Sequence, residues 1–447
     1  MTATSTRGGD EEAGVVSVTP ATLLATAERI RVRTIEQHQN DVAELVEAAL
    51  AARPHEGLRV DPALVAAQPD RYRRREVAVD VVAPIDLPPF ANSQMDGFAV
   101  SSPDLTDDRA TSLVVVDRIP AGRVGPALRP GTAAPIMTGA AVPDGADAVV
   151  PVEQVDPPLF PAEGADSRVS ITGPVASGTF VRDAGSDVRA GSVLLGAGTI
   201  LTPARWGVLA AAGVREVVVR RRPRLLLVST GEELAAPGAD LGPGAIHDAN
   251  GTALAAALAE VGVDVVTERV TDDAATLLAV VARHGADVDL VLTTGGVSAG
   301  AYEVVRDAFE ASGVVFGSVA MQPGGPQGHG TLTVGHRALP IVCFPGNPVS
   351  ALVSFEVFLR PLLQTATGVG RPRAQRAAPM AESADSPVGK HQLRRGRLDV
   401  DGRVALVGGP GSHLLSNHAA ATVLVHVPVG VDRVEEGDEV VVWALDD

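Results

Sequence analysis

Cysteine, lysine and aromatic residues are scarce in this chain of 447 residues. Cys343 is the only cysteine, which excludes an intramolecular disulfide and predicts a buried strand thiol. Lys390 is the only lysine, so the chain has no Gly-Lys-Ser/Thr loop of the kind that P-loop enzymes use to bind phosphates. Aromatic residues make up 3%, and the core must therefore be built mainly from Ala, Val and Leu.

The sequence also lacks features of membrane and secreted proteins. Residues 1–19 are small, polar and acidic, which predicts a disordered tail without the apolar segment of a signal peptide. No uninterrupted apolar run approaches the length that spans a bilayer. Together with the scarcity of cysteine, these absences favour a cytoplasmic protein that does not bind membranes.

A surplus of acidic residues limits the choice of partners. The formal net charge is −17 and the isoelectric point is near 5.0. Such a surface argues against nucleic acid and anionic membranes as general partners. An anionic ligand must therefore be held by a local group of residues.

The composition changes several times along the chain. Helical spacing of apolar residues predicts a helix over residues 20–50, and frequent Val, Pro and Gly predict a β-rich module over residues 76–185. Short apolar runs over residues 185–203 predict a strand hairpin. Residues 371–386 have the composition of a linker, and strand patterns over residues 391–447 predict a small β-domain.

Strands and helices alternate after the run Arg220-Arg221-Arg222-Pro223. Strands are expected at residues 225–228, 263–266, 288–292 and 341–344, with helices between and after them. Continuous apolar strands separated by helices predict a parallel sheet that is covered on both faces.

Three turns rich in glycine or polar residues follow strands of this predicted sheet. In an open parallel sheet such turns gather at the carboxyl edge, where glycine lets backbone N–H groups approach an anion. We therefore expect a ligand site formed by Ser229-Thr230-Gly231, Thr294-Gly295-Gly296-Val297-Ser298 and Pro345-Gly346-Asn347-Pro348.

Acidic residues lie beside these turns. Each of them alone is more typical of a helix cap or a solvated surface charge. Grouped near a phosphate, they would suit Mg²⁺, which prefers carboxylates, water and ligand phosphates. The residues concerned are Glu232, Glu233, Asp248, Asp272, Asp273 and Glu303.

Two further turns lie in the β-rich module, Met95-Asp96-Gly97 and Met137-Thr138-Gly139. Both are compatible with ordinary β-turns. The histidines show no metal-ligand spacing such as His-Glu-x-x-His.

The motifs, taken together and in order, resemble the MoeA/gephyrin family of molybdopterin molybdotransferases. The resemblance runs from about Pro84 to the Gly411-Ser412-His413 turn. It rests on the segment Leu87–Val100, on Ile136-Met137-Thr138-Gly139-Ala140, on Ser229-Thr230-Gly231-Glu232-Glu233-Leu234, and on the two turns at Thr294–Ser298 and Pro345–Ser350.

This resemblance implies a fold and a division into domains. The expected fold is multidomain α/β plus β: a doubly wound α/β molybdopterin-binding domain, a β-rich domain, an elongated mixed N-terminal domain and a C-terminal domain like a β-barrel. The implied boundaries are 20–85 with 185–220 for a discontinuous linker and dimerisation domain, 86–184 for β-rich domain II, 221–368 for the α/β domain and 374–447 for the C-terminal domain.

The resemblance also implies an activity. Such an enzyme inserts molybdate into adenylylated molybdopterin with Mg²⁺, releases AMP, and works as a homodimer whose site combines the α/β domain of one subunit with domain II of the other. The implied catalytic residues are Asp96, Thr138, Glu233 and Asp272, and the implied metal ligands are Asp272 and Glu303. The implied substrate-binding residues are Ser229, Thr230, Gly231, Asp248, Gly295, Gly296, Ser298, Pro345, Gly346, Asn347, Pro348 and Arg395; Asp187 is a further position of the family pattern.

The sequence departs from the family where cations are common. Ser318, Gln322 and Gly325 stand where lysines are frequent, and Glu303 stands where the family usually has Asp. Each lost charge-assisted hydrogen bond costs roughly 1.5–3 kcal/mol, although backbone amides or Arg306 offer replacements. The alternative to an active enzyme is therefore a molybdopterin-binding scaffold or carrier with weak or no metal insertion. An unrelated sugar or nucleotide phosphotransferase would leave the Met95-Asp96-Gly97 segment unexplained.

Overall fold

The computed structural model describes residues 32–162, 167–297 and 303–446. The predicted tail of residues 1–19 lies outside these residues. The chain forms two compact units, each described by itself below. The α/β unit comprises Met1–Glu56, Arg73–Arg75 and Arg220–Asp447, and the β-rich unit comprises Gly57–Tyr72 and Glu76–Val219.

The α/β unit contains a six-stranded sheet with the order β16-β13-β17-β21-β20-β18. Neighbours among β16, β13, β17 and β21 pair in parallel, whereas β20 is antiparallel to both β21 and β18. The bounds are β13 Arg224–Thr230, β16 Asp264–Val270, β17 Leu290–Thr294, β18 Val315–Ser318, β20 Pro326–Val334 and β21 Arg337–Phe344.

The four strands predicted from the sequence pair in parallel, as expected, whereas β18 and β20, which were not predicted, add two antiparallel pairings. Only Gly335 and His336 separate β20 from β21, and so short a connection reverses the chain and enforces antiparallel pairing. Gly335 has φ 61°, the left-handed conformation that such turns use.

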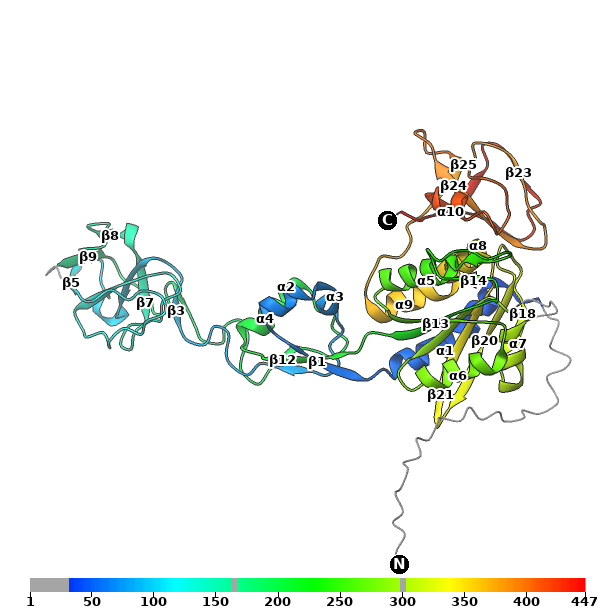
Figure 1. Ribbon diagram of the computed structural model, residues 1–447. Helices are drawn as coiled ribbons and strands as arrows, with labels where there is room; N and C mark the ends of the chain where they lie inside the picture. Colours follow the sequence, from blue (N-terminus) through cyan, green and yellow to red (C-terminus); the bar gives the residue numbers. More distant parts are fainter. Residues whose placement is uncertain (1–31, 163–166, 298–302, 447) are drawn as a thin grey trace, which may run out of the picture. The chain divides into compact units, whose positions relative to one another are not determined.

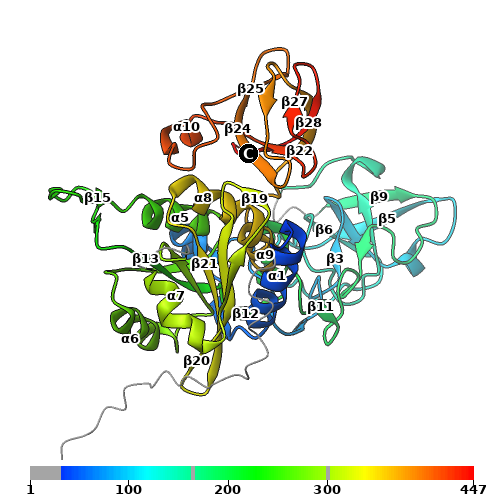
Figure 2. The ribbon, with the colours of Figure 1, turned by 90° about the vertical axis from the view of Figure 1, so that its right-hand side faces the viewer.

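Helices cover both faces of this sheet, as Figures 1 and 2 show. Leu225 and Leu227 of β13 face a core with α1, α5 and the continuous helix α8–η4–α9, whereas Leu226 and Val228 face a core with α6 and α7. Alternate residues thus serve opposite faces, as strand geometry requires. The bounds are α1 Ile35–Ala51, α5 Ala249–Glu260, α6 Ala274–His284, α7 Val304–Phe309, η3 Glu310–Ser312, α8 Pro348–Ser354, η4 Phe355–Leu359 and α9 Arg360–Thr367.

Helix α1 differs from its prediction in extent and in place. It begins at Ile35, where Thr34 caps it through a reciprocal capping box with Gln37, and residues 20–31 of the predicted helix lie outside the described residues. The predicted boundaries group it with residues 20–85, yet Val42, Val46 and Leu50 are buried in the core of the α/β sheet. Its apolar stripe is complementary to α9 and η4, against which it packs.

The helix over Pro348–Thr367 is long and apolar enough to cross a membrane by length and composition, which the sequence analysis did not anticipate. Of its apolar window, 67% is buried inside the protein. Arg360 within it pairs with Glu260 at 2.8 Å and with Glu356 at 3.4 Å. A core helix of a globular domain has the same composition, and the burial favours that interpretation.

The C-terminal domain is a sheet of order β19-β24-β26-β28-β22, with β25 paired to β24. Strand β22 lies within residues 371–386, which were expected to be a linker; its pairing with β28 makes it an edge strand instead. The bounds are β19 Met321–Gln322, β22 Gln375–Pro379, β23 Ala384–Asp385, β24 His391–Leu398, β25 Val404–Leu406, α10 Leu415–Ala419, β26 Val423–Val427, β27 Arg433–Val434 and β28 Glu439–Ala444.

The β-rich unit has a six-stranded sheet of order β7-β4-β6-β5-β9-β8. Phe98, Val100 and Leu113 are buried at its core. The bounds are β4 Gly97–Val100, η1 Ser102–Asp104, β5 Ala110–Val115, β6 Thr132–Ile136, β7 Ala148–Pro151, η2 Val152–Gln154, β8 Val155–Asp156 and β9 Arg168–Thr172.

The β-rich unit also contains short strand pairs that join distant segments of the chain. Strand β11 pairs with β2, so the hairpin predicted within residues 185–203 is wrong: its strand pairs with residues more than a hundred positions earlier. Other elements here are β1 His55–Arg59, α2 Pro62–Ala67, α3 Pro69–Tyr72, β2 Val81–Val82, β3 Asn92–Ser93, β10 Val181–Arg182, β11 Val193–Leu195, α4 Pro203–Ala211 and β12 Glu216–Arg220.

Candidate functional site

A cavity of about 1100 Å³ lies at the carboxyl ends of β13, β17 and β21 in the α/β unit. Parallel pairing brings these ends together, since Ser229 lies opposite Thr294, and Thr294 opposite Phe344. Eleven residues of the three predicted turns line the cavity: Ser229, Thr230, Gly231, Thr294, Gly295, Gly296, Val297, Pro345, Gly346, Asn347 and Pro348. Ser298 lies outside the described residues.

The turns approach one another more closely than side chains would allow. Gly295 has φ 100°, and a Cβ there would fall 2.6 Å from the carbonyl oxygen of Thr230. A Cβ on Gly346 would fall 3.3 Å from the Cα of Gly295. The absence of side chains exposes backbone in the cavity and makes this wall suitable for a planar or phosphorylated ligand.

Asn250 fixes the turns to each other. Its amide donates to the hydroxyl of Thr294 at 2.9 Å and to the carbonyl of Gly346 at 2.7 Å. Asn250 was not among the residues predicted for the site. Its position two residues after Asp248, the N-cap of α5, was the available signal.

The acidic residues separate into two groups. Glu233, Asp248, Asp272 and Glu303 line the cavity, whereas Glu232 and Asp273 do not. Asp273 caps α6 by accepting from the backbone of Thr276 at 2.9 Å, and its hydrogen bonds with Thr276 lower the pKa of its carboxyl. The helix-cap interpretation is thus confirmed for Asp273.

Two of the lining carboxylates have defined positions. Glu233 lies over Gly231, where a Cβ would fall 2.5 Å from its Oε2. Asp248 caps α5 by accepting from the backbone of Gly251 at 2.8 Å. In the described residues, these acids do not form a ready cluster of three ligand atoms, so a cation here would also need oxygens from the substrate.

The cavity is also lined by the segment in which the family resemblance predicts lysines. Ser318, Gln322 and Gly325 all line the cavity. Lys390 lines it as well; strand β24 follows directly and pairs in parallel with Met321 and Gln322. Lys390 was not predicted as a site residue, although its being the only lysine of the chain was a signal.

Arg306 and Arg395 do not line the cavity. The guanidinium of Arg306 lies over the ring of Phe316 at 5.2 Å. Arg395 is 3% exposed and donates to the carbonyls of Gly409 and Gly411, the latter at 3.0 Å. It holds the loop from which Pro410, Gly411, Ser412 and His413 line the cavity, and so it positions this wall without touching the cavity itself.

Asp96 and Thr138 meet in the β-rich unit. Strands β4 and β6 pair antiparallel with Gly97 opposite Ile136, which places the preceding Asp96 beside the following Thr138. Asp96 accepts from the Thr138 hydroxyl at 2.6 Å and from its backbone N–H at 2.7 Å. These bonds lower the pKa of the Asp96 carboxyl, and both side chains are exposed. Asp187 is an exposed residue of the same unit.

Comparisons with known proteins cover nearly the whole chain. Residues 33–213 match the family described as MoeA N-terminal region (domain I and II), residues 226–365 a probable molybdopterin binding domain, and residues 377–445 the MoeA C-terminal region (domain IV).

Two curated relatives are matched over most or all of their length. The chain is 45% identical over 427 residues to molybdopterin molybdenumtransferase 2 of Mycobacterium tuberculosis, covering 92% of this chain and 100% of the relative. It is 35% identical to the molybdopterin molybdenumtransferase of Synechococcus elongatus, with 83% and 92% covered.

A solved structure shares the fold. The molybdopterin biosynthesis MoeA protein from Pyrococcus horikosii has a TM-score of 0.71 at 28% identity, with 93% of this chain and 100% of that chain covered. The expected fold class, multidomain α/β plus β, is confirmed. The chain therefore belongs to the MoeA family of molybdopterin molybdenumtransferases, enzymes of molybdenum cofactor biosynthesis.

Proposed function

We propose that this enzyme inserts molybdate into adenylylated molybdopterin and releases AMP, with the pterin and its phosphates held in the cavity of the α/β unit. The observation that carries the proposal is the convergence of three backbone-rich turns and four carboxylates on one cavity of about 1100 Å³. Such a volume is at the upper end of those that hold small-molecule ligands.

Glu233 and Asp272 are the proposed catalytic acids of this cavity. A water oxygen adds to phosphorus of the phosphoanhydride and the bridging P–O bond breaks, so that AMP and the pterin phosphate separate. Glu233 or Asp272 accepts the proton that the water loses. Thr138 and Asp96 are assigned to the same reaction, as argued below.

The donor set of the cavity fits Mg²⁺. Asp272 and Glu303 offer carboxylate oxygens, the hard ligands that Mg²⁺ prefers, and the substrate phosphates would supply further oxygens. When bound, Mg²⁺ supplies charge that offsets the negative charge of the phosphoanhydride.

We propose that Lys390 replaces the lysines missing at Ser318, Gln322 and Gly325. It is the only lysine of the chain, it is exposed, and it lines the same wall as those three residues. A flexible ammonium group there can hold a phosphate or the molybdate oxyanion. Lys390→Ala should raise KM for molybdate about tenfold or more, the equivalent of one charge-assisted hydrogen bond. Lys390→Arg should retain most of the affinity.

Asp96 and Thr138 are proposed to complete the site from a partner subunit in a homodimer. They form a preorganised pair with an ionised carboxylate that is exposed to solvent, and Phe90 and Met95 of the preceding segment are 46% and 37% exposed. A solvent-exposed carboxylate and exposed apolar side chains together suit a contact surface.

The assay for the activity follows AMP release and the activation of a molybdenum-free apoenzyme after incubation with adenylylated molybdopterin, Mg²⁺ and molybdate. Turnover is the expected result. Tight pterin binding without AMP release would instead support a scaffold or carrier. Relatives from Mycobacterium tuberculosis and Synechococcus elongatus are named molybdopterin molybdenumtransferases, which does not favour that alternative.

A mixing experiment tests whether two subunits share the site. Asp96→Asn and Glu233→Gln are each expected to be inactive. Random exchange of subunits should restore about a quarter of the wild-type activity, because half the dimers are mixed and each has one intact site. No recovery despite verified exchange would place both residues in the same subunit's site or remove one of them from it. Activity in this experiment is measured by AMP release under reducing conditions, because the chain is expected to be cytoplasmic.

A further inference from the structure

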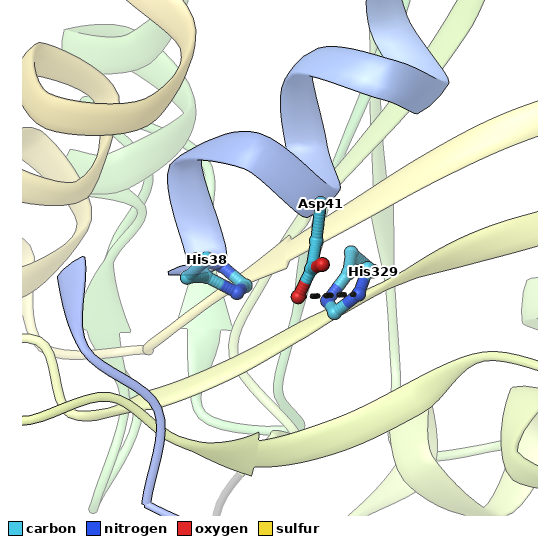
Figure 3. A group of neighbouring side chains, drawn as sticks. All are labelled: His38, Asp41 and His329. Atoms are coloured by element: carbon cyan, nitrogen blue, oxygen red, sulfur yellow. Dashed lines mark ion pairs between the residues drawn. The ribbon is translucent and has the colours of Figure 1, made fainter. Parts of the chain in front are cut away.

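A buried pair of histidines lies beside a carboxylate on the face of the sheet that α1 covers. His38 and Asp41 lie three residues apart on α1 and therefore on one side of that helix, and His329 faces them from β20 (Figure 3). One ligand atom from each residue lies within 4.8 Å of the other two, and His329 Nε2 is 3.7 Å from Asp41 Oδ2. This group is separate from the cavity-lining residues.

The nitrogen atoms of the pair lack hydrogen-bond partners. Both ring nitrogens of His38 and the Nδ1 atom of His329 are buried and have no hydrogen-bond partner. His38 is 1% exposed and His329 is 7% exposed, so bulk water does not reach these atoms easily. A buried imidazole always has an N–H donor or a lone pair to satisfy, and leaving one unsatisfied destabilises the fold. The edge-on contact of His38 with the ring of Phe358, 4.6 Å between centroids, fixes the imidazole without satisfying its nitrogens.

We propose that His38, Asp41 and His329 bind a divalent transition-metal ion of the Zn²⁺ class, with water at the remaining position. Two imidazoles with one carboxylate form a ligand set that Zn²⁺ favours, whereas Mg²⁺ and Ca²⁺ prefer sites made of oxygen ligands alone. Ligand atoms around a tetrahedral ion with bonds of about 2.0–2.1 Å lie roughly 3.4 Å apart, so the observed spacing needs only small side-chain rotations.

The site has both ready ligands and a route to solvent. Burial lowers the pKa of His38 to about 3 and that of His329 to about 4, with Arg33 contributing to both, so each ring is neutral near pH 7 and offers a lone pair. The side chain of Asp41 is 41% exposed, which leaves one side open for the ion and its water.

Arg33 is expected to lower the affinity of this site for a metal ion. Its Nε lies 3.4 Å from Asp41 Oδ2, where it competes with a cation for the carboxylate. Its backbone also pairs with the cavity wall: the N–H of Arg33 donates to Ser318 at 3.0 Å, and its carbonyl accepts from Ala320 at 2.8 Å. A bound ion would thus join α1 to β20 next to the segment that carries Ser318.

The test uses the full-length chain after removal of metals with a chelator. Co²⁺ is titrated in the presence of excess Mg²⁺, which occupies all-oxygen sites such as the carboxylates of the cavity. We expect one equivalent of Co²⁺ to give visible ligand-field bands, and Zn²⁺ to displace it. The absence of such bands, or their resistance to Zn²⁺, overturns the proposal.

Variants locate the ion. Asp41→Asn and His329→Gln should weaken binding by more than the roughly 10–100-fold that loss of an outer-shell partner costs. Asp41 is part-exposed, so its variant keeps the fold even if the histidine variant does not. Arg33→Gln should strengthen binding, because it removes the competing cation and leaves the backbone pairing with Ser318 intact.

Two histidines outside the cluster serve as controls. His336 is exposed in the β20–β21 turn, and His391 Nε2 lies 3.1 Å from His426 Nδ1 in the C-terminal domain. His336→Gln and His391→Gln should leave the Co²⁺ spectrum unchanged. If His391→Gln abolishes it while Asp41→Asn does not, the ion lies on the other pair and the proposal is wrong.

Discussion

The cavity of the α/β unit and the Asp96–Thr138 pair of the β-rich unit position acidic groups in different ways. In the cavity, parallel strand ends and glycine turns bring the backbone together, and Asn250 fixes it with two hydrogen bonds. In the β-rich unit, one antiparallel pairing places a single carboxylate against a single hydroxyl at the surface. The first arrangement should tolerate little change in its backbone, whereas the second should respond to its two side chains alone.

The largest effect is expected for the carboxylates of the cavity. Glu233→Ala and Asp272→Ala should lower kcat for AMP release by about 100-fold or more, the usual contribution of a positioned proton acceptor, and should leave the melting temperature nearly unchanged. Rates are measured at saturating substrate. If both variants keep the wild-type turnover, neither acid takes part in the reaction.

Neighbouring acids supply matched controls for this experiment. Glu232→Ala should leave kcat unchanged, because Glu232 does not line the cavity. Asp273→Ala should lower stability by about 1 kcal/mol through loss of the α6 cap and leave kcat unchanged. A fall in kcat for either variant would show that lining the cavity does not decide which of these acids contribute to turnover.

A glycine substitution tests the role of the backbone in the cavity. Gly295→Ala should cost roughly 2–4 kcal/mol of unfolding free energy, because its Cβ meets a backbone oxygen at 2.6 Å and its φ is 100°. Gly335→Ala should cost only about 1–2 kcal/mol, since it carries the strain of a positive φ without a clash. Chemical denaturation measures both. Equal losses would mean that close approach of the turns is unimportant.

A smaller effect is expected when the loop of the C-terminal domain is loosened. Arg395→Lys loses the fork that binds the carbonyls of Gly409 and Gly411, and should raise KM about tenfold with little change in kcat. Arg397→Lys on the same strand is the control, because Arg397 bonds to Ala420 away from the cavity. A reduced kcat with constant KM would instead indicate that Arg395 acts on the reacting groups.

The smallest effect is expected for the pKa of Asp96 when the Thr138 hydroxyl is removed. Hydrogen bonds from Thr138 hold the pKa of Asp96 below its ordinary value of 3.8, so the carboxylate stays charged to lower pH than a free one. Thr138→Val removes the hydroxyl, and the pKa should rise toward 3.8 while remaining lowered by the backbone bond. NMR titration of the Asp96 carboxyl measures this shift. Thr138→Ser should keep the wild-type value.

The sequence predicted the cavity better than it predicted the β-rich unit. Apolar runs at residues 225–228, 288–292 and 341–344 marked three strands, and the rule for parallel sheets then placed their following turns at one edge. No such rule joined Met95-Asp96-Gly97 to Met137-Thr138-Gly139, nor residues 81–82 to 193–195. Antiparallel partners far apart in sequence are chosen by packing, which local patterns do not record.

The structure also separated residues that looked alike in the sequence. Asp272 and Asp273 are adjacent, yet one lines the cavity and the other caps a helix. Arg395 was expected to bind substrate but is held by backbone carbonyls, and Lys390, from the same strand region, is the cation that lines the cavity. Which way a side chain points depends on strand twist and neighbouring loops.

The sequence by itself determined the family, the alternation of strands and helices in the α/β unit, and the three turns at the carboxyl edge of its sheet. Each of these features depends on residues that are close together in the chain. Only the tertiary structure decided the antiparallel course of β20, the place of α1 on the sheet, the contact of Asp96 with Thr138, and the meeting of His38 and Asp41 with His329. Those arrangements depend on burying complementary apolar faces from distant segments, a balance that arises only when the whole chain is folded.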